Sequence, residues 1–291
     1  MELYRDVIKK FYGDHEKFLT GMYPGLRPER LTLELFSFMR ALNATEAVET
    51  DNELFISTAH HPARAFFKKV EEGVPLQYIS GRAAFRHSDY LVNSSVLIPR
   101  PETELLVDFA LKEASSFRGT FNIIDVGTGS GAIILSLLQE IGRPVRAWAT
   151  DTSSEALKMA RRNFFRLRYS IHPDSKLDFL RLDRLYGFSE KANMIITNPP
   201  YLRKGQEIHP QVSQYEPHEA LFLDSEVYRH WFSVFFEQAF HVLETNGIMF
   251  MEGNEDAMSE LKNIAQKKGF ESVTIIKDYT DRDRFLVCRK S

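Results

Sequence analysis

FNIIDVGTGSGAIILSLLQEIG, residues 121–142, has the pattern of a strand, a glycine-rich turn and a helix, in that order. Its first residues include the branched apolar side chains typical of a buried strand, and its last eleven have the length and composition of a helix. Between them, Gly127, Gly129 and Gly131 let the backbone turn sharply and let a ligand come close without Cβ clashes. These residues therefore predict the first β-α unit of a parallel sheet, with a nucleoside-bearing ligand at the turn.

The chain after Pro101 alternates between strand and helix patterns. Further strands are expected at 145–151, 177–183, 193–198 and 247–253, and helices directly after Pro101 and at 153–167, 232–243 and 261–270. Residues 271–279 and 283–290 can form a closing antiparallel pair. Alternation of this kind predicts an α/β fold, a doubly wound and mostly parallel sheet that binds ligands at the carboxyl edge of its strands.

The residues before Pro101 have a different pattern. Apolar residues at helical spacing in 31–42 and 63–73 predict a small helical bundle, and the aromatic and branched residues of 76–85 and 90–99 predict a hairpin. The expected divisions are a helical domain at 1–74, a hairpin linker at 75–100 and an α/β domain at 101–291. We expect the helical domain to recognise a protein substrate.

Composition limits the class of protein. The 291 residues carry a formal net charge of -3, which disfavours nucleic acid as the main partner. One cysteine excludes an internal disulfide framework, and no apolar run is long enough for a membrane span or signal core. We therefore expect a cytoplasmic protein. The histidines show no metal-ligand spacing, so no metal is expected, and His60 and His61 are interpreted as a loop or helix cap.

The ligand of the glycine turn cannot be identified from the turn alone. Gly127, Gly129 and Ala132 also satisfy the nicotinamide dinucleotide pattern, and Asp151, at the end of the next strand, is placed to bind a ribose in either case. The turn without any ligand is a third interpretation.

Asn198-Pro199-Pro200-Tyr201 follows the predicted strand 193–198, at the same edge of the sheet as the glycine turn. The Asn198 side-chain oxygen and the Pro199 carbonyl can each accept one N–H of an amide or exocyclic amine, two prolines hold the backbone rigid, and the Tyr201 ring can stack on a flat group. A plain Asn-Pro turn is the alternative. Together with the glycine turn and Asp151, the tetrapeptide predicts transfer of a methyl group to a planar nitrogen.

From about residue 73 to its end, the chain resembles the PrmC/HemK family of release factor glutamine methyltransferases. The residues that carry the resemblance are Asn198–Tyr201 together with PLQYISG (75–81), Phe85, IPRPETE (98–104), YEP (215–217), AL (220–221) and KDY (277–279).

The resemblance implies a helical bundle, a β-hairpin and a Rossmann-like class I domain with a seven-stranded, mostly parallel sheet. It implies methylation of N5 of the glutamine in the GGQ motif of class-1 peptide chain release factors, with S-adenosylmethionine converted to S-adenosylhomocysteine. We expect a monomer that binds neither nucleic acid nor membrane directly. The implied cofactor residues are Gly127, Thr128, Gly129, Ser130, Gly131, Asp151, Asp183, Arg184 and Asn198, and the implied substrate residues are Asn198, Pro199, Pro200 and Tyr201.

Two positions depart from the family pattern. Arg184 stands where an aromatic residue usually follows the acid near the adenine, so the adenine is expected either to stack on the guanidinium or to be stacked more weakly. Glu252 and Gly253 lack the usual spacer between them, which predicts a shortened loop.

Two other functions remain open. An adenine-N6 DNA or guanine-N2 RNA methyltransferase presents a comparable amino group, although it would have to expose a base and grip phosphates. A binding module with a vestigial methyltransferase domain is the other. The aromatic and basic residues of 66–69 and 160–168 are interpreted as solvated helix faces with buried aromatics. Arg82 and Arg86 could face an acidic partner or simply lie on the surface.

Overall fold

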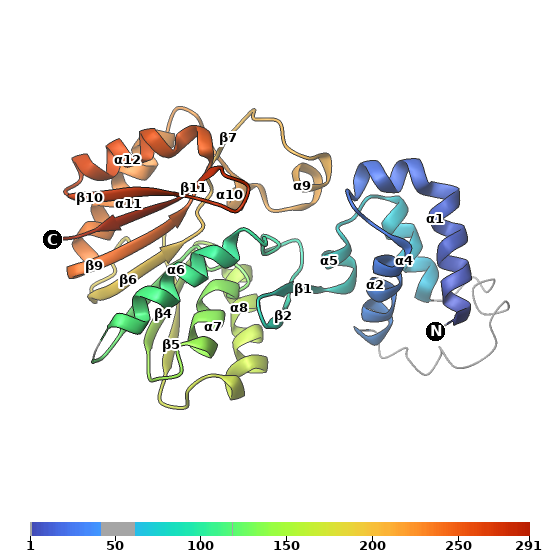
Figure 1. Cartoon of the computed structure of the whole chain (residues 1–291), viewed down its shortest axis with the longest axis horizontal. Coiled ribbons are helices and arrows are strands. Elements are labelled where there is room, and N and C mark those ends of the chain that lie inside the picture. Colours follow the sequence, from blue (N-terminus) through green and yellow to red (C-terminus); the bar gives the residue numbers. More distant parts are fainter. Residues whose placement is uncertain (1, 42–61, 118) are drawn as a thin grey trace. The chain divides into compact units, whose positions relative to one another are not determined.

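The computed structural model describes residues 2–41, 62–117 and 119–291 (Figure 1). His60 and His61 lie outside these residues. The chain forms two compact units. Unit 1 comprises Met1–Ala83, Val92–Ser94 and Ile208–Glu216, and unit 2 comprises Ala84–Leu91, Ser95–Glu207 and Pro217–Ser291.

Unit 1 is helical, as predicted. Its helices are α1 (Glu2–Met22), α2 (Pro28–Ala41), α4 (Pro62–Glu71), α5 (Leu76–Ser80) and α9 (Pro210–Tyr215). Leu19, Leu35 and Phe66 are among the buried side chains of its core. The Tyr23 hydroxyl donates to the carbonyls of Val70 (3.0 Å) and Val74 (2.7 Å), which fixes the end of α4 against the turn after α1.

Residues Ile208–Glu216 join unit 1 although they follow most of the α/β domain in the chain. The Gln211 side chain donates to the carbonyl of Gly73 (2.9 Å), and the Tyr215 hydroxyl donates to that of Glu72 (2.6 Å). These bonds satisfy carbonyls at the end of α4 that have no partner within the helix. No pattern in the sequence predicted them.

The first strand predicted for the hairpin is wrong in its first half. Pro75 precedes the single-turn helix α5, and Gly81, with φ of +72°, ends it in the left-handed conformation. Leu76 and Ile79 are buried, so the apolar residues that suggested a strand instead pack one face of this short helix.

The hairpin itself is shorter than predicted. It consists of β1 (Arg82–Phe85) and β2 (Ser88–Leu91), and the chain passes from unit 1 to unit 2 within it. The strand predicted at 90–99 is wrong beyond Leu91. Val96 and Ile98 are buried in irregular backbone, so their apolar character reflects packing and not strand pairing.

Unit 2 contains the predicted seven-stranded sheet, in the order β10-β11-β9-β6-β3-β4-β5 (Figure 1). The strands are β3 (Asn122–Val126), β4 (Arg146–Asp151), β5 (Lys176–Arg181), β6 (Ala192–Thr197), β9 (Leu243–Glu252), β10 (Ser272–Lys277) and β11 (Asp283–Arg289). The first five run parallel, and β11 pairs antiparallel with both β9 and β10, which confirms the closing pair. A separate short pair joins β7 (Leu202–Arg203) to β8 (Phe222–Leu223).

Helices cover both faces of this sheet, and strand residues alternate between them. Ile123 packs with α6 (Thr103–Ser116) and α7 (Ala132–Glu140), whereas Ile124 packs with α11 (Tyr228–Val242) and α12 (Met258–Lys267). The remaining helical segments are α8 (Ser154–Leu167), α10 (His218–Leu221) and the 3-10 turns η2 (Arg168–Ser170) and η3 (Glu255–Ala257). The sheet therefore lies between two layers of helices, and the parallel strands end at one edge between these layers.

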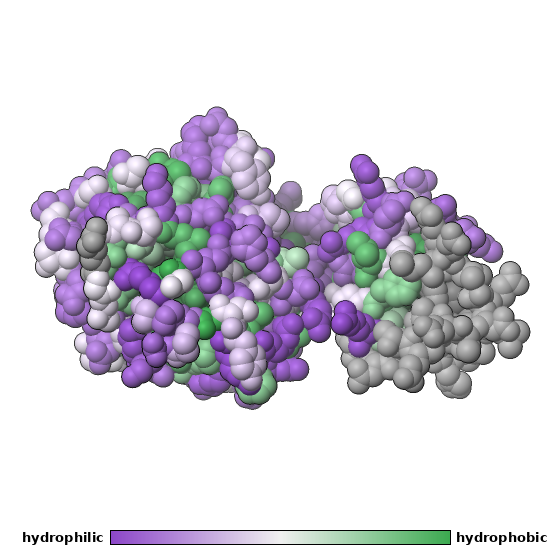
Figure 2. Space-filling view, turned by 60° about the horizontal axis from the view of Figure 1, so that its bottom comes forward, coloured by the Kyte–Doolittle hydropathy of each residue, from purple (hydrophilic) through white to green (hydrophobic). Residues whose placement is uncertain are grey.

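The surface of α8 differs from the expectation. Phe164 packs against the core, as predicted, but Phe165 is 66% exposed with the Arg168 guanidinium over its ring, so the prediction of buried aromatics is wrong for Phe165. Elsewhere, on the face in Figure 2, apolar residues form small patches among hydrophilic ones. Among the described residues, no helix has the length and apolar character needed to span a membrane.

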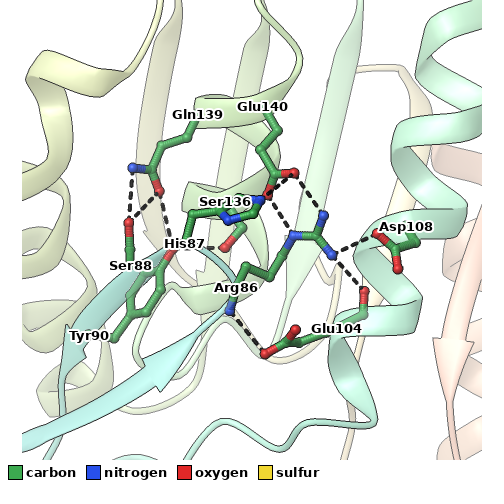
Figure 3. A network of polar contacts seen from close by, with 9 residues as sticks. All are labelled: Arg86, His87, Ser88, Tyr90, Glu104, Asp108, Ser136, Gln139 and Glu140. Carbon is green, nitrogen blue, oxygen red and sulfur yellow. Dashed lines mark hydrogen bonds and ion pairs between the residues drawn. The ribbon is translucent and has the colours of Figure 1, made fainter.

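Arg86 is engaged inside unit 2 (Figure 3), contrary to both interpretations of this residue. Its Nε and Nη2 donate to the two oxygens of Glu140 (2.6 and 2.7 Å), and its Nη1 donates to Asp108 Oδ1 (2.7 Å) and the Glu104 carbonyl (3.2 Å). The bonds to Glu140, and then those to Asp108, raise the pKa of the guanidinium. The tip of the hairpin is thereby fastened to α6 and α7.

Candidate active site

The glycine turn connects β3 to α7, as predicted. Gly127, Gly129 and Gly131 all have positive φ, which favours glycine. A Cβ on Gly131 would lie 3.3 Å from Ala160 Cβ, whereas a Cβ on Gly129 would meet no atom within 4 Å. The turn is therefore closed against α8 but open at Gly129, where a ligand can approach the backbone.

Asp151 at the end of β4 closes one side of this turn. Its Oδ2 accepts from the Gly129 amide (2.9 Å) and its Oδ1 from the Ser153 amide (2.9 Å). Burial raises the pKa of this carboxyl, and the backbone donors oppose that shift because they stabilise the charged form. Each carboxylate oxygen retains a lone pair, so Asp151 can also accept hydrogen bonds from two ribose hydroxyls.

A second carboxyl lies buried beneath the turn. Asp125 in β3 accepts from the Thr128 hydroxyl (2.7 Å) and is inaccessible to solvent. Burial raises its pKa to about 7, and the nearby charge of Asp151 adds to this. It supports the turn from below and was not singled out from the sequence.

Asn198 follows β6 and lies beside the turn. Thr197 Oγ1 donates to the carbonyl of Val126 (2.7 Å), and a Cβ on Gly127 would lie 3.9 Å from the Asn198 carbonyl oxygen. The Asn198 Nδ2 donates to Thr103 Oγ1 (3.3 Å). Its Oδ1 is buried and has no hydrogen-bond partner among the described residues. This oxygen is positioned to accept an N–H from a ligand.

The Tyr201 ring is held by a buried carboxylate. Its hydroxyl donates to Glu252 Oε1 (3.3 Å), and burial raises the pKa of the phenol. Glu252 Oε2 accepts from the Thr103 hydroxyl (2.6 Å). Thr103 and Glu252 are thus shared between Asn198 and Tyr201. Thr103 belongs to a motif that carries the family resemblance, whereas Glu252 was noted only where the chain departs from the family pattern.

Glu252 is 1% exposed, and burial raises its pKa. The Thr103 hydrogen bond and the positive charge of Arg284 oppose this shift. Arg284 Nε in turn donates to Asp278 Oδ2 (3.2 Å). In the loop after Glu252, Gly253 lies so close to Met258 that a Cβ would stand 2.7 Å from its terminal carbon.

Asp183 and Arg184 follow β5 and pair with each other. Arg184 Nε and Nη2 donate to the two oxygens of Asp183 (3.0 and 2.7 Å), and Nη1 donates to the Trp231 carbonyl (3.3 Å). The Arg184 side chain is only 15% exposed. In this structure its guanidinium is occupied by protein groups, which differs from the stacking position expected from the sequence.

Asn163 was missed by sequence reasoning. It is fully buried in α8, where its Oδ1 accepts from the Leu91 amide (2.7 Å) and its Nδ2 donates to the carbonyls of Leu91 (3.0 Å) and Ser130 (2.9 Å). It therefore joins β2 to the glycine turn. An asparagine within a helical pattern carries no signal of this role.

The known proteins to which this chain is similar include methyltransferases. Residues 101–220 match the family model described as "Methyltransferase small domain". Among solved structures, a methyltransferase from Pyrococcus furiosus is 18% identical, with a TM-score of 0.50 over 79% of this chain and 97% of that chain. At this identity the likeness shows the fold alone.

Curated relatives are closer in sequence. The release factor glutamine methyltransferase of Flavobacterium psychrophilum is 33% identical over 75% of this chain and 76% of its own length. That of Leptospira interrogans is 34% identical over 73% and 74%. That of Bacteroides thetaiotaomicron is 28% identical over 94% and 96%, which includes the helical region. With a methyltransferase sheet, a glycine turn and the Asn198 tetrapeptide at one edge, the chain belongs to the release factor glutamine methyltransferase family.

Proposed function

We propose that this enzyme transfers a methyl group from S-adenosylmethionine to N5 of the glutamine in the GGQ motif of class-1 release factors, leaving S-adenosylhomocysteine. The observation that carries the proposal is the buried Asn198 Oδ1 beside the glycine turn, which has no hydrogen-bond partner in the part of the chain that the structure describes. The names of the curated relatives support the same substrate.

The substrate amide nitrogen has two hydrogens, and the site offers two acceptors. Asn198 Oδ1 accepts one, and the carbonyl of Pro199 accepts the other. Leaving a buried acceptor unpaired costs about 1–3 kcal/mol, so the substrate N–H recovers stability that the free enzyme lacks. Both hydrogen bonds fix the nitrogen and increase its electron density.

S-adenosylmethionine supplies an electrophilic methyl group on a sulfonium. The chain needs no general base before transfer, because the nitrogen attacks with its own electrons and releases a proton afterwards. Pro199 and Pro200 keep the acceptors in place, so little ordering is needed at the moment of reaction. The Tyr201 ring, held by Glu252, provides a flat surface for the amide.

The residues around the turn fit this cofactor. Open space at Gly129 admits the methionine part, and Asp151 can bind the ribose hydroxyls. Gly127, Thr128, Ser130 and Gly131 are also assigned to binding S-adenosylmethionine. Asp183 and Arg184 are assigned to the region around its adenine. The Asp183–Arg184 pair would present a polar edge there and no stacking ring.

The helical domain, residues 1–74, is proposed to recognise the release factor, with 75–100 as linker and 101–291 as the catalytic domain. A glutamine amide occurs in almost every protein, so the tetrapeptide alone cannot select one, and binding energy from remote contacts must position it. We place the enzyme in the cytoplasm as a monomer, where its substrate acts.

Mass spectrometry tests the proposal. Incubation of a purified class-1 release factor with the enzyme and S-adenosylmethionine should add one methyl group to the GGQ glutamine, and a factor with alanine at that position should gain none. Asn198→Ala enzyme is the matched control and should lose nearly all turnover while still binding the cofactor. Labelled methyl groups on DNA or ribosomal RNA, with an unmodified release factor, would overturn the proposal.

A further inference from the structure

The side-chain amide of Asn198 has two ends of nearly equal size and opposite hydrogen-bonding character. With Oδ1 toward the substrate it accepts an N–H. Turned by half a rotation, it presents its own N–H groups to those of the glutamine, and the interaction becomes repulsive. Catalysis as proposed therefore requires something to select one orientation.

The hydroxyl of Thr103 supplies this selection. It has a single hydrogen, which it donates to Glu252 Oε2 at 2.6 Å. Only lone pairs are left for its other neighbour, so it can accept from Asn198 but cannot donate to it. The Asn198 Nδ2, at 3.3 Å, is the end that satisfies this requirement, and Oδ1 is left for the substrate.

Glu252 sets the direction of the Thr103 hydroxyl. An ionised carboxylate only accepts hydrogen bonds, and both of its oxygens face hydroxyl donors, those of Thr103 and Tyr201. Burial raises the pKa of Glu252, and the hydrogen bonds from Thr103 and Tyr201 and the positive charge of Arg284, itself held by Asp278, oppose this shift. With Glu252 ionised, Thr103 donates to Glu252 and accepts from Asn198, which is the arrangement of the hydrogen bonds in the structure.

We propose that Thr103 is a positioning residue that, with its hydroxyl oriented by Glu252, holds the Asn198 amide with its oxygen toward the nitrogen to be methylated. The inference rests on the proposed function. Thr103 lies in α6 and Glu252 at the end of β9, so residues from two elements remote from the tetrapeptide in sequence determine which end of the Asn198 amide faces the substrate.

Thr103→Val removes the hydroxyl with little change in shape, and Thr103→Ser keeps it. We expect Thr103→Val to lower kcat on a release factor by about tenfold or more, the scale of one lost hydrogen bond. Cofactor affinity, measured by calorimetry, should change less than about twofold, and Thr103→Ser should restore most of kcat. Thr274→Val, on the exposed side of β10, is the matched control and should leave both quantities unchanged.

A double-mutant cycle separates positioning from a general structural effect. If Thr103 acts through Asn198, Thr103→Val should lower the residual rate of the Asn198→Ala enzyme no further. An equal further loss in that background, or a normal kcat for Thr103→Val alone, would overturn the inference.

Glu252→Gln tests the second link. A glutamine can donate to Thr103, whose hydrogen then becomes available to Asn198 Oδ1, so kcat should fall while cofactor binding persists. An unchanged kcat would remove Glu252 from the inference. Absence of release-factor methylation by the unmodified enzyme would instead refute the proposed function, so the two failures are distinguishable.

Discussion

Replacing Arg86 by methionine keeps the apolar stem and removes the guanidinium of a side chain that is 11% exposed. Its partner Glu140 is 21% exposed, and Asp108 is 54% exposed. Breaking a buried ion pair costs about 3–5 kcal/mol, and an exposed pair contributes about 0.2–1 kcal/mol. The contact with Glu140 resembles a buried ion pair more closely, and the contact with Asp108 resembles an exposed one. We therefore expect Arg86→Met to lower the free energy of unfolding of unit 2 by about 2–3 kcal/mol.

Urea denaturation followed by tryptophan fluorescence measures this loss, because both tryptophans, Trp148 and Trp231, lie in unit 2. A cycle with Glu140→Gln should give a coupling energy of about 1–2 kcal/mol. Arg162→Met, on the exposed side of α8, is the control and should cost about 0.5 kcal/mol or less. A loss of that small size for Arg86→Met, or a coupling energy near zero, would refute the view that this pair fastens the hairpin.

Three further changes test the site and its support. Asp151→Ala should weaken S-adenosylmethionine binding by about 1.5–3 kcal/mol in calorimetry, and unchanged affinity would mean that the ribose is held elsewhere. Gly131→Ala should lower the free energy of unfolding by about 1–3 kcal/mol, because it adds a contact at 3.3 Å from Ala160 Cβ to the strain of a φ of +82°. In the same denaturation assay Gly129→Ala should show strain alone, and an equal cost for both would exclude the contact. The pKa of Asp125 is raised to about 7, so its contribution to stability is fully present below about pH 4 and is lost as the pH rises through 7. Asp125→Asn cannot ionise, so its stability relative to the unmodified protein should increase between pH 5 and pH 8, and a constant difference would contradict the shift.

Most of the sheet was predictable because its signals are local. Strands buried on both faces, such as β3 and β6, are rich in apolar residues, and the closing pair β10–β11 was recognised from two adjacent runs at the C-terminal end. The hairpin region was not, because a single helical turn such as α5 has too few residues to show a period of 3.6. The placement of Ile208–Glu216 in unit 1 depends on contacts with residues far away in the chain, which no local pattern contains.

In the site, too, some residues were predictable from local sequence patterns and others were not. Gly127–Gly131, Asp151 and Asn198 were expected at one edge because the carboxyl ends of parallel strands meet there, and the structure brings them together. Thr103 and Glu252 are 149 residues apart, and their hydrogen bond follows only from the packing of α6 beside β9. Arg184, which pairs with Asp183, has a backbone φ of +56°, a conformation that non-glycine residues rarely adopt and that no local sequence pattern signals.

The late segment of unit 1 has a consequence for the order of events during synthesis. The Tyr215 hydroxyl reaches the carbonyl of Glu72 across 143 residues of chain. At about 5–20 residues per second, a ribosome needs roughly 7–29 s to add those residues. During that interval β3, β4 and β6 are synthesised, whereas Tyr215, which bonds to the Glu72 carbonyl, is still absent. The carbonyls of Glu72 and Gly73 thus gain these two hydrogen bonds only after most of the parallel strands have been synthesised, and slowing elongation between Glu72 and Tyr215 should delay them.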